Sequence, residues 1–204
     1  MNADPPLILA SQSPRRAQLL AEAGLTFEQR SPPFADPDQP PDDLRGHEAE
    51  AYAVALAQQK ARSMADAVDG LAWILAADTI CVDDTGALVG KPRDRAHADV
   101  MLRSFCETEH RVITGVALLR VGPETSEMQA FADTATVTFG SIRDEQLDAY
   151  LRSDDWQGKA GGYNLFDRQD AGWPIAVVGD ETTVVGLPMA RLVPRLHASL
   201  HSSP

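Results

Sequence analysis

Two short apolar runs constrain the fold of this chain more than any other feature. The runs Leu7-Ile8-Leu9-Ala10 and Leu71 to Ala77 are continuous and end in polar residues, as is typical of strands buried on both faces. An Ala-rich stretch of good helix formers, from about Glu48 to Asp66, lies between them. Strands of this kind are buried because helices cover both faces of their sheet. The chain is therefore predicted to have an α/β fold.

Shorter signals add further strands and helices. Ser13 is expected to cap a helix that begins at Pro14 and ends at Gly24, and Asp84-Thr85-Gly86 predicts a hairpin turn. The other predicted elements are helices at about 94–105, at about 144–151 and from 188 onward, and strands at 112–121, 128–139, 175–178 and 182–185. Hairpins and strand–helix–strand units together predict a mixed twisted sheet with flanking helices. We expect one domain over residues 1–204, with flexible ends at 1–6 and 198–204.

Charge and cysteine usage exclude several classes of function. The 204 residues include 18 Lys and Arg against 30 Asp and Glu, a net charge of -12. This balance argues against broad binding of nucleic acid or of an anionic membrane, although a local basic pocket can still hold a small anion. No apolar run approaches the ~18–20 residues that span a bilayer, and the acidic N-terminus is unlike a signal peptide. Cys81 and Cys106 stand too far apart to indicate a disulfide framework or a zinc site. We expect a cytoplasmic protein.

The choice between arginine and lysine is unusually uneven. The chain has 15 Arg but only three Lys, which are Lys60, Lys91 and Lys159. Each of these lysines lies in a segment that also carries other candidate binding residues. Chance placement of three surface lysines is the alternative interpretation.

The segment from Ser11 to Arg16 is a candidate anion site, because it joins a buried strand to a helix start. The N-terminus of a helix offers unpaired N–H groups and a positive dipole end. The hydroxyls of Ser11 and Ser13 and the guanidinium groups of Arg15 and Arg16 add donors that suit phosphate oxygens. The alternative is a capped helix with two solvated arginines. Two cations in the first turn oppose the helix dipole, however, and this conflict favours a functional role.

Three other positions carry groups that can bind or react. Asp78 follows the second apolar run, where ligands gather beyond the carboxyl ends of strands in open α/β sheets. A carboxylate there can hold Mg²⁺ or accept a proton from water, although Asp also ends strands as a turn residue. Lys91 and Lys159 each place a cation beside a stiff or tight turn. None of the three identifies a function alone.

Taken in order, these segments resemble the signatures of the Maf family. The matched segments are L-A-S-x-S-P-R-R at Leu9 to Arg16, L-A-x-x-K-A at Leu56 to Ala61, A-D-T at Ala77 to Thr79, K-P-R-D at Lys91 to Asp94, K-A-G-x-Y at Lys159 to Tyr163 and V-V-G-L-P at Val184 to Pro188. Matches run from residue 7 to residue 190. Each short motif is common, but the combination is highly specific.

The resemblance implies an activity and a site. Maf proteins hydrolyse nucleoside triphosphates between the α- and β-phosphates, release pyrophosphate, use a divalent cation such as Mg²⁺ or Mn²⁺ and often form homodimers. It also implies an elongated fold with two lobes around a cleft, similar to inosine triphosphatases. The family's proton acceptor falls on Asp78. Asp36 stands where the family usually has a second acidic residue, a Glu, so Asp36 and Asp78 are the expected metal ligands.

We therefore predict that the triphosphate is bound by Arg15, Arg16, Lys60 and Lys91, with Ser11, Ser13 and Lys159 as further contacts. Asp78 either activates the attacking water or binds the metal, and the sequence leaves both roles open. A nucleotide-binding regulator of cell division with slow hydrolysis is the alternative function. Cleavage at the γ-phosphate is a weaker one.

The resemblance also bears on the preferred base. Maf proteins that prefer dTTP and UTP combine an Arg after S-P, a Thr after the catalytic Asp, and a Gln three residues beyond the Tyr of K-A-G-x-Y. Arg15 and Thr79 match the first two positions, but Phe166 stands at the third. Gln169 could replace it if the loop bulges, or Phe166 could stack on the base. We expect preference for dTTP and UTP with broader tolerance of other bases.

Overall fold

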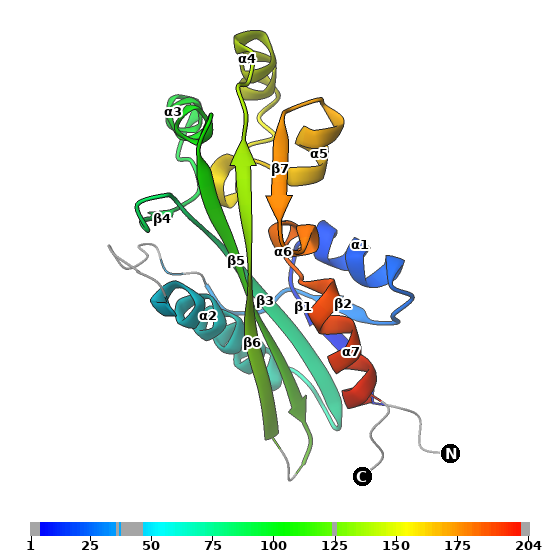
Figure 1. Cartoon of the computed structure of the whole chain (residues 1–204). Helices are drawn as coiled ribbons and strands as arrows, with labels where there is room; N and C mark the ends of the chain where they lie inside the picture. Colours follow the sequence, from blue (N-terminus) through cyan, green and yellow to red (C-terminus); the bar gives the residue numbers. More distant parts are fainter. Residues whose placement is uncertain (1–4, 36, 38–46, 124–125, 201–204) are drawn as a thin grey trace.

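The structure is a computed structural model and describes residues 5–35, 37, 47–123 and 126–200. A seven-stranded mixed sheet forms its centre (Figure 1). The strands across it are, in order, β2 (Glu28–Arg30), β1 (Leu7–Ala10), β3 (Ala72–Val82), β5 (Glu109–Val121), β6 (Ser126–Phe139) and β7 (Ile175–Val178), and β4 (Leu88–Val89) also pairs with β3. β1 runs parallel to β2 and β3. The pairs β3–β4, β3–β5, β5–β6 and β6–β7 are antiparallel. The predicted mixed α/β class is confirmed.

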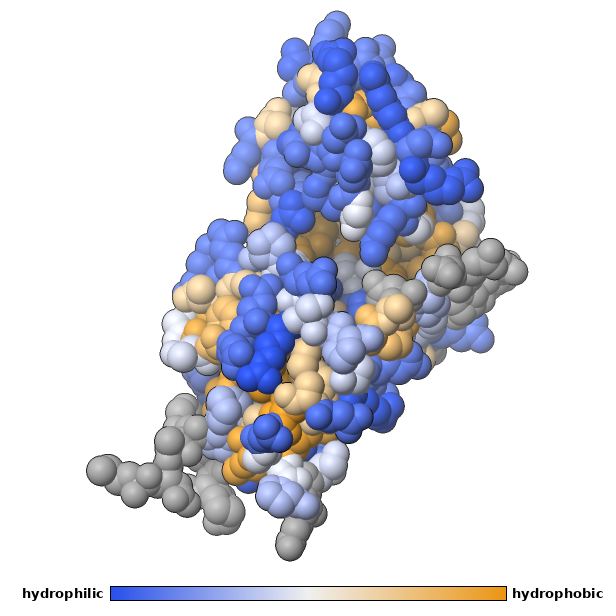
Figure 2. Space-filling model, turned by 180° about the vertical axis from the view of Figure 1, so that it is seen from behind, coloured by the Kyte–Doolittle hydropathy of each residue, from blue (hydrophilic) through white to orange (hydrophobic). Residues whose placement is uncertain are grey.

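Helices cover both faces of the sheet and gather at one end of it (Figure 1). Helix α2 (His47–Ala65) packs its alanines on one face, and α1 (Pro14–Glu22) and α7 (Met189–Leu200) pack leucines on the other. A further core cluster joins α3 (Arg95–Phe105) and α4 (Asp144–Ser153) to the far ends of β5 and β6, beside α5 (Leu165–Asp170). The molecule therefore has two lobes, and the opposite face shows a hollow between them (Figure 2).

Local signals set several element boundaries as predicted. Ser13 caps α1 by accepting a hydrogen bond from the Arg16 backbone N–H, and Pro14 opens the helix. Gly24 follows its end with φ +73°. Along β6 the residues Ala135, Val137 and Phe139 are buried, whereas the threonines between them are not.

Other predicted elements are wrong. Residues 182–185 form part of helix α6 (Glu181–Val185) and not a strand, because the Asp180 side chain caps the Thr182 N–H at 2.9 Å. This cap outweighs the strand propensity of Thr-Thr-Val-Val. The sequence prediction also lacks helix α5 and the short strand β2, and α7 continues through residues 198–200, where we expected a flexible end.

None of the helices in the described ranges combines the length and the apolar composition of a membrane-spanning segment.

Candidate active site

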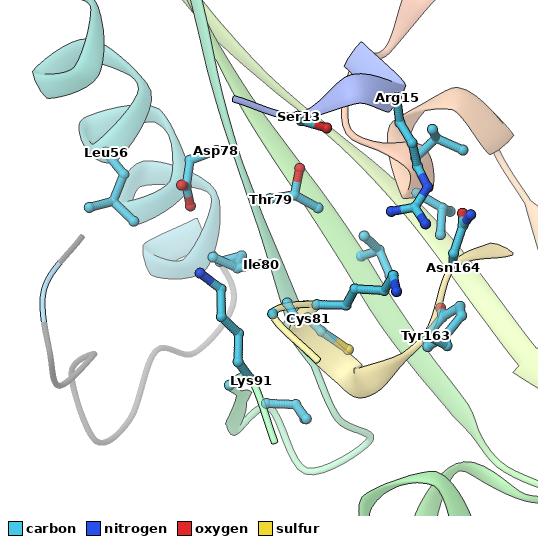
Figure 3. A pocket seen from close by; sticks show the side chains of 18 of the residues that line it. Ser13, Arg15, Leu56, Asp78, Thr79, Ile80, Cys81, Lys91, Tyr163 and Asn164 are labelled. Atoms are coloured by element: carbon cyan, nitrogen blue, oxygen red, sulfur yellow. The ribbon is translucent and has the colours of Figure 1, made fainter. Parts of the chain in front are cut away.

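A cleft between the two lobes opens at an unpaired stretch of the β3 edge. β1 pairs with β3 as far as Leu75, and β4 begins to pair at Cys81. Among the described residues, no strand pairs with residues 76–80 on this side. A cavity of about 820 Å³ lies against this stretch. Figure 3 shows Asp78 and Thr79 on its wall.

The apolar run predicted that Asp78 ends a strand, but Asp78 lies inside β3. The strand continues to Val82 because β5 pairs with it along its whole length, with Asp78 opposite Gly115. Successive residues of a strand point to opposite faces of the sheet. Asp78 therefore faces α2, and Thr79 faces α1.

Positive side chains dominate the cleft. Among the described lining residues, six Lys or Arg side chains stand against one carboxylate, that of Asp78. The cations are Arg15, Arg16, Lys60, Lys91, Arg93 and Lys159. All three lysines of the chain thus meet in one cavity, although they are far apart in the sequence. In a chain with a net charge of -12, this local excess indicates a polyanionic ligand.

The two serines before α1 act as hydrogen-bond acceptors in this structure. Ser11 Oγ accepts from the Ser13 N–H at 3.2 Å, and Ser13 Oγ accepts from the Arg16 N–H at 3.4 Å. Both serines line the cleft, so their hydroxyl protons can be donated to an anion there. The helix N-terminus predicted as an anion site therefore does face the cleft.

Arg16 is held at three of its nitrogen atoms by neutral acceptors. Its Nε donates to the Gly186 carbonyl at 2.9 Å, its Nη1 to Ser11 Oγ at 3.3 Å, and its Nη2 to Thr79 Oγ1 at 3.1 Å. These three acceptors are uncharged, and together they fix the orientation of the guanidinium group.

Asp78 forms an ion pair with Lys60 between β3 and α2. Lys60 Nζ lies 2.5 Å from Asp78 Oδ1, and each side chain is only 12% exposed. The close approach of α2 depends on Gly115, because a Cβ at that position would overlap the backbone of Ala53. The pair sets a carboxylate that can accept a proton or bind a cation beside an ammonium group that can bind phosphate.

Arg15 and Lys159 concentrate positive charge elsewhere in the cleft. Burial lowers the pKa of Lys159, and the neighbouring charge of Arg15 lowers it further. Arg15 Nη2 lies 3.2 Å from Asp167 Oδ2, an ion pair that is half exposed on its acidic side. Burial would raise the pKa of Asp167, but hydrogen bonds from Asn164 and Arg15 and the charge of Arg15 lower it overall. An anion bound here would reduce the repulsion between the two cations.

Three other titratable side chains at the cleft or beneath it are neutral near pH 7. Burial raises the pKa of the Cys81 thiol, so this residue is not a reactive nucleophile. Tyr163 lines the cleft, and burial raises its pKa as well. Its hydroxyl lies 2.7 Å from Nε2 of His110, whose pKa is lowered to about 4 by burial. These groups support the cleft wall without adding charge.

The two residues considered for base recognition beyond Tyr163 do not line the cleft. Phe166 is 36% exposed, and Gln169 Nε2 donates to Glu181 at 3.4 Å. The bulged loop that would bring Gln169 inward is absent, because residues 165–170 form helix α5. The role of Gln169 in base selection stays a prediction, and this geometry does not support it. Thr79 does line the cleft.

The predicted metal ligands are only partly described. Asp36 lies outside the described residues, so its role stays a prediction. Within the described ranges, no three His, Cys, Asp or Glu side chains lie close enough to hold a metal ion. A single carboxylate such as Asp78 does suit Mg²⁺, which proteins often bind through one or two carboxylates together with substrate phosphates and water.

Sequence reasoning missed three groups that belong to the cleft. Arg93 and Asn164 line it, and the Gly186 carbonyl orients Arg16. Arg93 and Gly186 stand inside the quoted K-P-R-D and V-V-G-L-P motifs, so a signal for them was available. Asn164 carried no such signal, because only the helix that follows it brings it to the site.

Several known proteins are similar to this chain. The family described as Maf-like protein matches residues 6–199. A dTTP/UTP pyrophosphatase from Salinibacter ruber is 40% identical over 195 residues, which cover 95% of this chain and 91% of that protein. A dTTP/UTP pyrophosphatase from Caulobacter vibrioides is 37% identical and covers 93% of each chain.

Among solved structures, a nucleoside-triphosphatase / dITP/XTP pyrophosphatase from Mycobacterium abscessus aligns with 67% of this chain and 75% of its own. The identity is 16% and the TM-score 0.40, too slight a likeness to support an inference. The family match and the two relatives are sufficient: this chain belongs to the Maf family.

Proposed function

We propose that this chain is a nucleoside triphosphate pyrophosphatase that hydrolyses the bond between the α- and β-phosphates. The observation that carries the proposal is the cleft with six cations and one carboxylate, that of Asp78, among its described lining residues. A triphosphate needs several cations, and its hydrolysis relies mainly on positioning and on charge stabilisation. Relatives at 36–40% identity are named dTTP/UTP pyrophosphatase, which supports the same reaction and does not favour a regulator without catalysis.

We assign the triphosphate to Arg15, Arg16, Lys60, Lys91 and Lys159, with the serine hydroxyls and the N-terminus of α1 as further donors. Asp78 accepts the proton of the water that attacks the α-phosphorus or binds the divalent cation. The cation, when bound with the phosphates, would neutralise part of their charge. The two roles of Asp78 are separable, because loss of a ligand raises the Mg²⁺ concentration needed for half-maximal activity, whereas loss of a base lowers kcat at saturating Mg²⁺.

We further propose preference for dTTP and UTP, with broader tolerance of other bases. The names of the relatives and the presence of Arg15 and Thr79 in the cleft support the preference. The tolerance follows from the third position of the pattern, where Phe166 replaces Gln and lies off the cleft lining. Without an amide at that position, the site has one hydrogen-bonding group fewer to discriminate between bases.

The test is to measure pyrophosphate and phosphate release from dTTP, UTP, CTP, GTP and 7-methyl-GTP with Mg²⁺ or Mn²⁺. We expect pyrophosphate and the monophosphate, with the highest kcat/KM for dTTP and UTP. Release of inorganic phosphate instead would indicate cleavage at the γ-phosphate, and binding without release would favour the regulator. A higher kcat/KM for 7-methyl-GTP than for dTTP would overturn the base preference.

A cytoplasmic location and a homodimer, both expected from the sequence, stay part of this proposal. Cell fractionation and sedimentation of the purified protein test them.

A further inference from the structure

The hydroxyl of Thr114 lies behind the cleft wall and is absent from the cleft lining. Thr114 belongs to β5, pairs with Thr79 of β3 and is fully buried. Its Oγ1 lies 2.9 Å from Thr79 Oγ1 and 2.7 Å from the Thr183 carbonyl oxygen. A buried hydroxyl in the centre of a sheet is costly unless it is hydrogen-bonded, and valine has nearly the same shape. The polar group therefore calls for an explanation.

The direction of these hydrogen bonds follows from counting protons. A carbonyl oxygen only accepts, so Thr114 donates its single hydroxyl proton to the Thr183 carbonyl. Thr79 must then donate its hydroxyl proton to Thr114, and Thr79 Oγ1 accepts a hydrogen bond from Arg16 Nη2 at 3.1 Å. The result is one directed chain from the arginine through two hydroxyls to a backbone carbonyl.

This chain closes into a ring around Arg16. Thr183 lies in α6, and the Gly186 carbonyl at the end of that helix accepts Arg16 Nε at 2.9 Å. A Cβ on Gly186 would lie 3.1 Å from Arg16 Nε and 3.3 Å from Thr79 Oγ1, which shows how tightly the ring is packed. Thr114 thus ties together β3, β5 and α6, and two of these elements supply acceptors to the guanidinium group.

We infer that Thr114 is a positioning residue that fixes the guanidinium of Arg16 in the cleft through Thr79 and α6. The ligand that Arg16 meets, the triphosphate, rests on the proposed function. The ring itself rests only on the contacts above. Loss of the Thr114 hydroxyl would leave Thr79 without its acceptor and the Thr183 carbonyl without this donor, so two of the acceptors that hold Arg16, Thr79 and Gly186, would be held less firmly.

The first test compares Thr114→Val, which removes the hydroxyl at nearly constant shape, with Thr114→Ser, which retains it. Because a small misplacement of a catalytic-site group can cost about 10²-fold, we expect kcat/KM for dTTP to fall about 10- to 100-fold in Thr114→Val. For Thr114→Ser we expect a kcat/KM for dTTP within about threefold of the parent value. Thr136→Val on the neighbouring strand β6, away from the ring, is the matched control. Parent-like activity of Thr114→Val, or equal losses in both variants, would overturn the inference.

The second test is a double-mutant cycle with Arg16→Ala, which a general packing defect would not satisfy. If Thr114 acts through Arg16, Thr114→Val should have almost no further effect once Arg16 is alanine. Effects that multiply would overturn the inference. If Thr114→Val does not fold, Thr79→Val breaks the same chain one link closer to the cleft and enters the same cycle.

Tripolyphosphate binding, measured by calorimetry, separates this inference from the proposed function. A parent chain that releases no pyrophosphate contradicts the proposed function, but the cycle can still be completed on the affinity for tripolyphosphate. Weaker binding in Thr114→Val that disappears in the Arg16→Ala background supports the positioning role. Unchanged binding of tripolyphosphate by Thr114→Val overturns it.

Discussion

Two neighbouring residues of β3 serve the cleft from opposite faces of the sheet and by different means. On the α2 face, Asp78 and Lys60 form a nearly buried ion pair. On the other face, Thr79 belongs to a set of neutral hydrogen bonds that orients Arg16. Removing one member of a buried ion pair strands a charge, whereas removing one hydroxyl only loosens a position. The comparison teaches that one face holds its carboxylate through a charged partner, whereas the other face orients a cation through uncharged hydrogen-bond acceptors.

The largest effect is expected on the charged face, the α2 side of the sheet with Asp78 and Lys60. Asp78→Asn should lower kcat for pyrophosphate release by roughly 10²–10⁴-fold, the usual scale for the loss of a general base. Asp99→Asn removes an exposed carboxylate outside the cleft and is the matched control. Near-parent turnover of a folded Asp78→Asn protein would contradict the role of Asp78.

Gly115→Ala tests how the charged face is assembled. The added methyl would overlap the Ala53 backbone, so α2 has to move away from the sheet, and Lys60 moves with it. We expect a loss of about 3 kcal/mol in the free energy of unfolding, at the upper end for overpacking, measured by urea denaturation. A stability within 0.5 kcal/mol of the parent, roughly the scatter of ordinary surface substitutions, would mean that α2 is not held this closely.

The pH dependence of stability tests a third region, the core around His110 at the start of β5. The pKa of His110 is about 4 in the folded chain and about 6.5 when unfolded, so His110 binds a proton more readily after unfolding. Its contribution to stability is complete above pH 6.5 and is lost as the pH falls towards 4, by about 3 kcal/mol in total. Urea denaturation between pH 7 and pH 4 should show this loss, and His110→Gln should reduce it. An unchanged pH dependence in His110→Gln would assign the loss to other groups.

Gly186→Ala perturbs the neutral face, the side of the sheet where Thr79 and Gly186 accept hydrogen bonds from Arg16. Gly186 has φ +121°, and an alanine there is strained and also meets Arg16 Nε. We expect a loss of about 1–3 kcal/mol in unfolding free energy together with lower kcat/KM for dTTP. Gly24→Ala also places an alanine at a positive φ, +73°, but nothing lies within 4 Å of the new methyl, so it should lose some stability and retain activity. Equal activity in the two variants would show that Gly186 does not act through Arg16.

The smallest effect is expected at the exposed ion pair. Asp167→Asn removes the partner of Arg15, but Asp167 is 54% exposed, and exposed pairs contribute about 0–1 kcal/mol. Stability should therefore change by less than about 1 kcal/mol, and kcat/KM by less than about fivefold. A loss as large as that of Gly186→Ala would show that Arg15 needs its carboxylate as much as Arg16 needs its ring.

The sequence by itself determined the elements that depend on neighbouring residues. The cap at Ser13, the helix start at Pro14 and the alternation along β6 follow from local hydrogen bonds and from side-chain periodicity. The short motifs also contained all six described cations of the cleft.

Only the tertiary structure decided where these groups point. The end of a strand and a polar residue that faces a cleft from inside a strand look alike in sequence. Pairing with β5, and with β4 from Cys81, extends β3 past Asp78. The Asp180 cap of helix α6 is local, but only the folded chain brings Gly186, at the end of that helix, to Arg16. Helix α5 likewise directs Gln169 away from the cleft and leaves Asn164 facing it. The physical reason is that the groups around Arg16 come from distant parts of the chain: Thr79 lies 63 positions and Gly186 170 positions beyond it, and no local pattern encodes such a pairing.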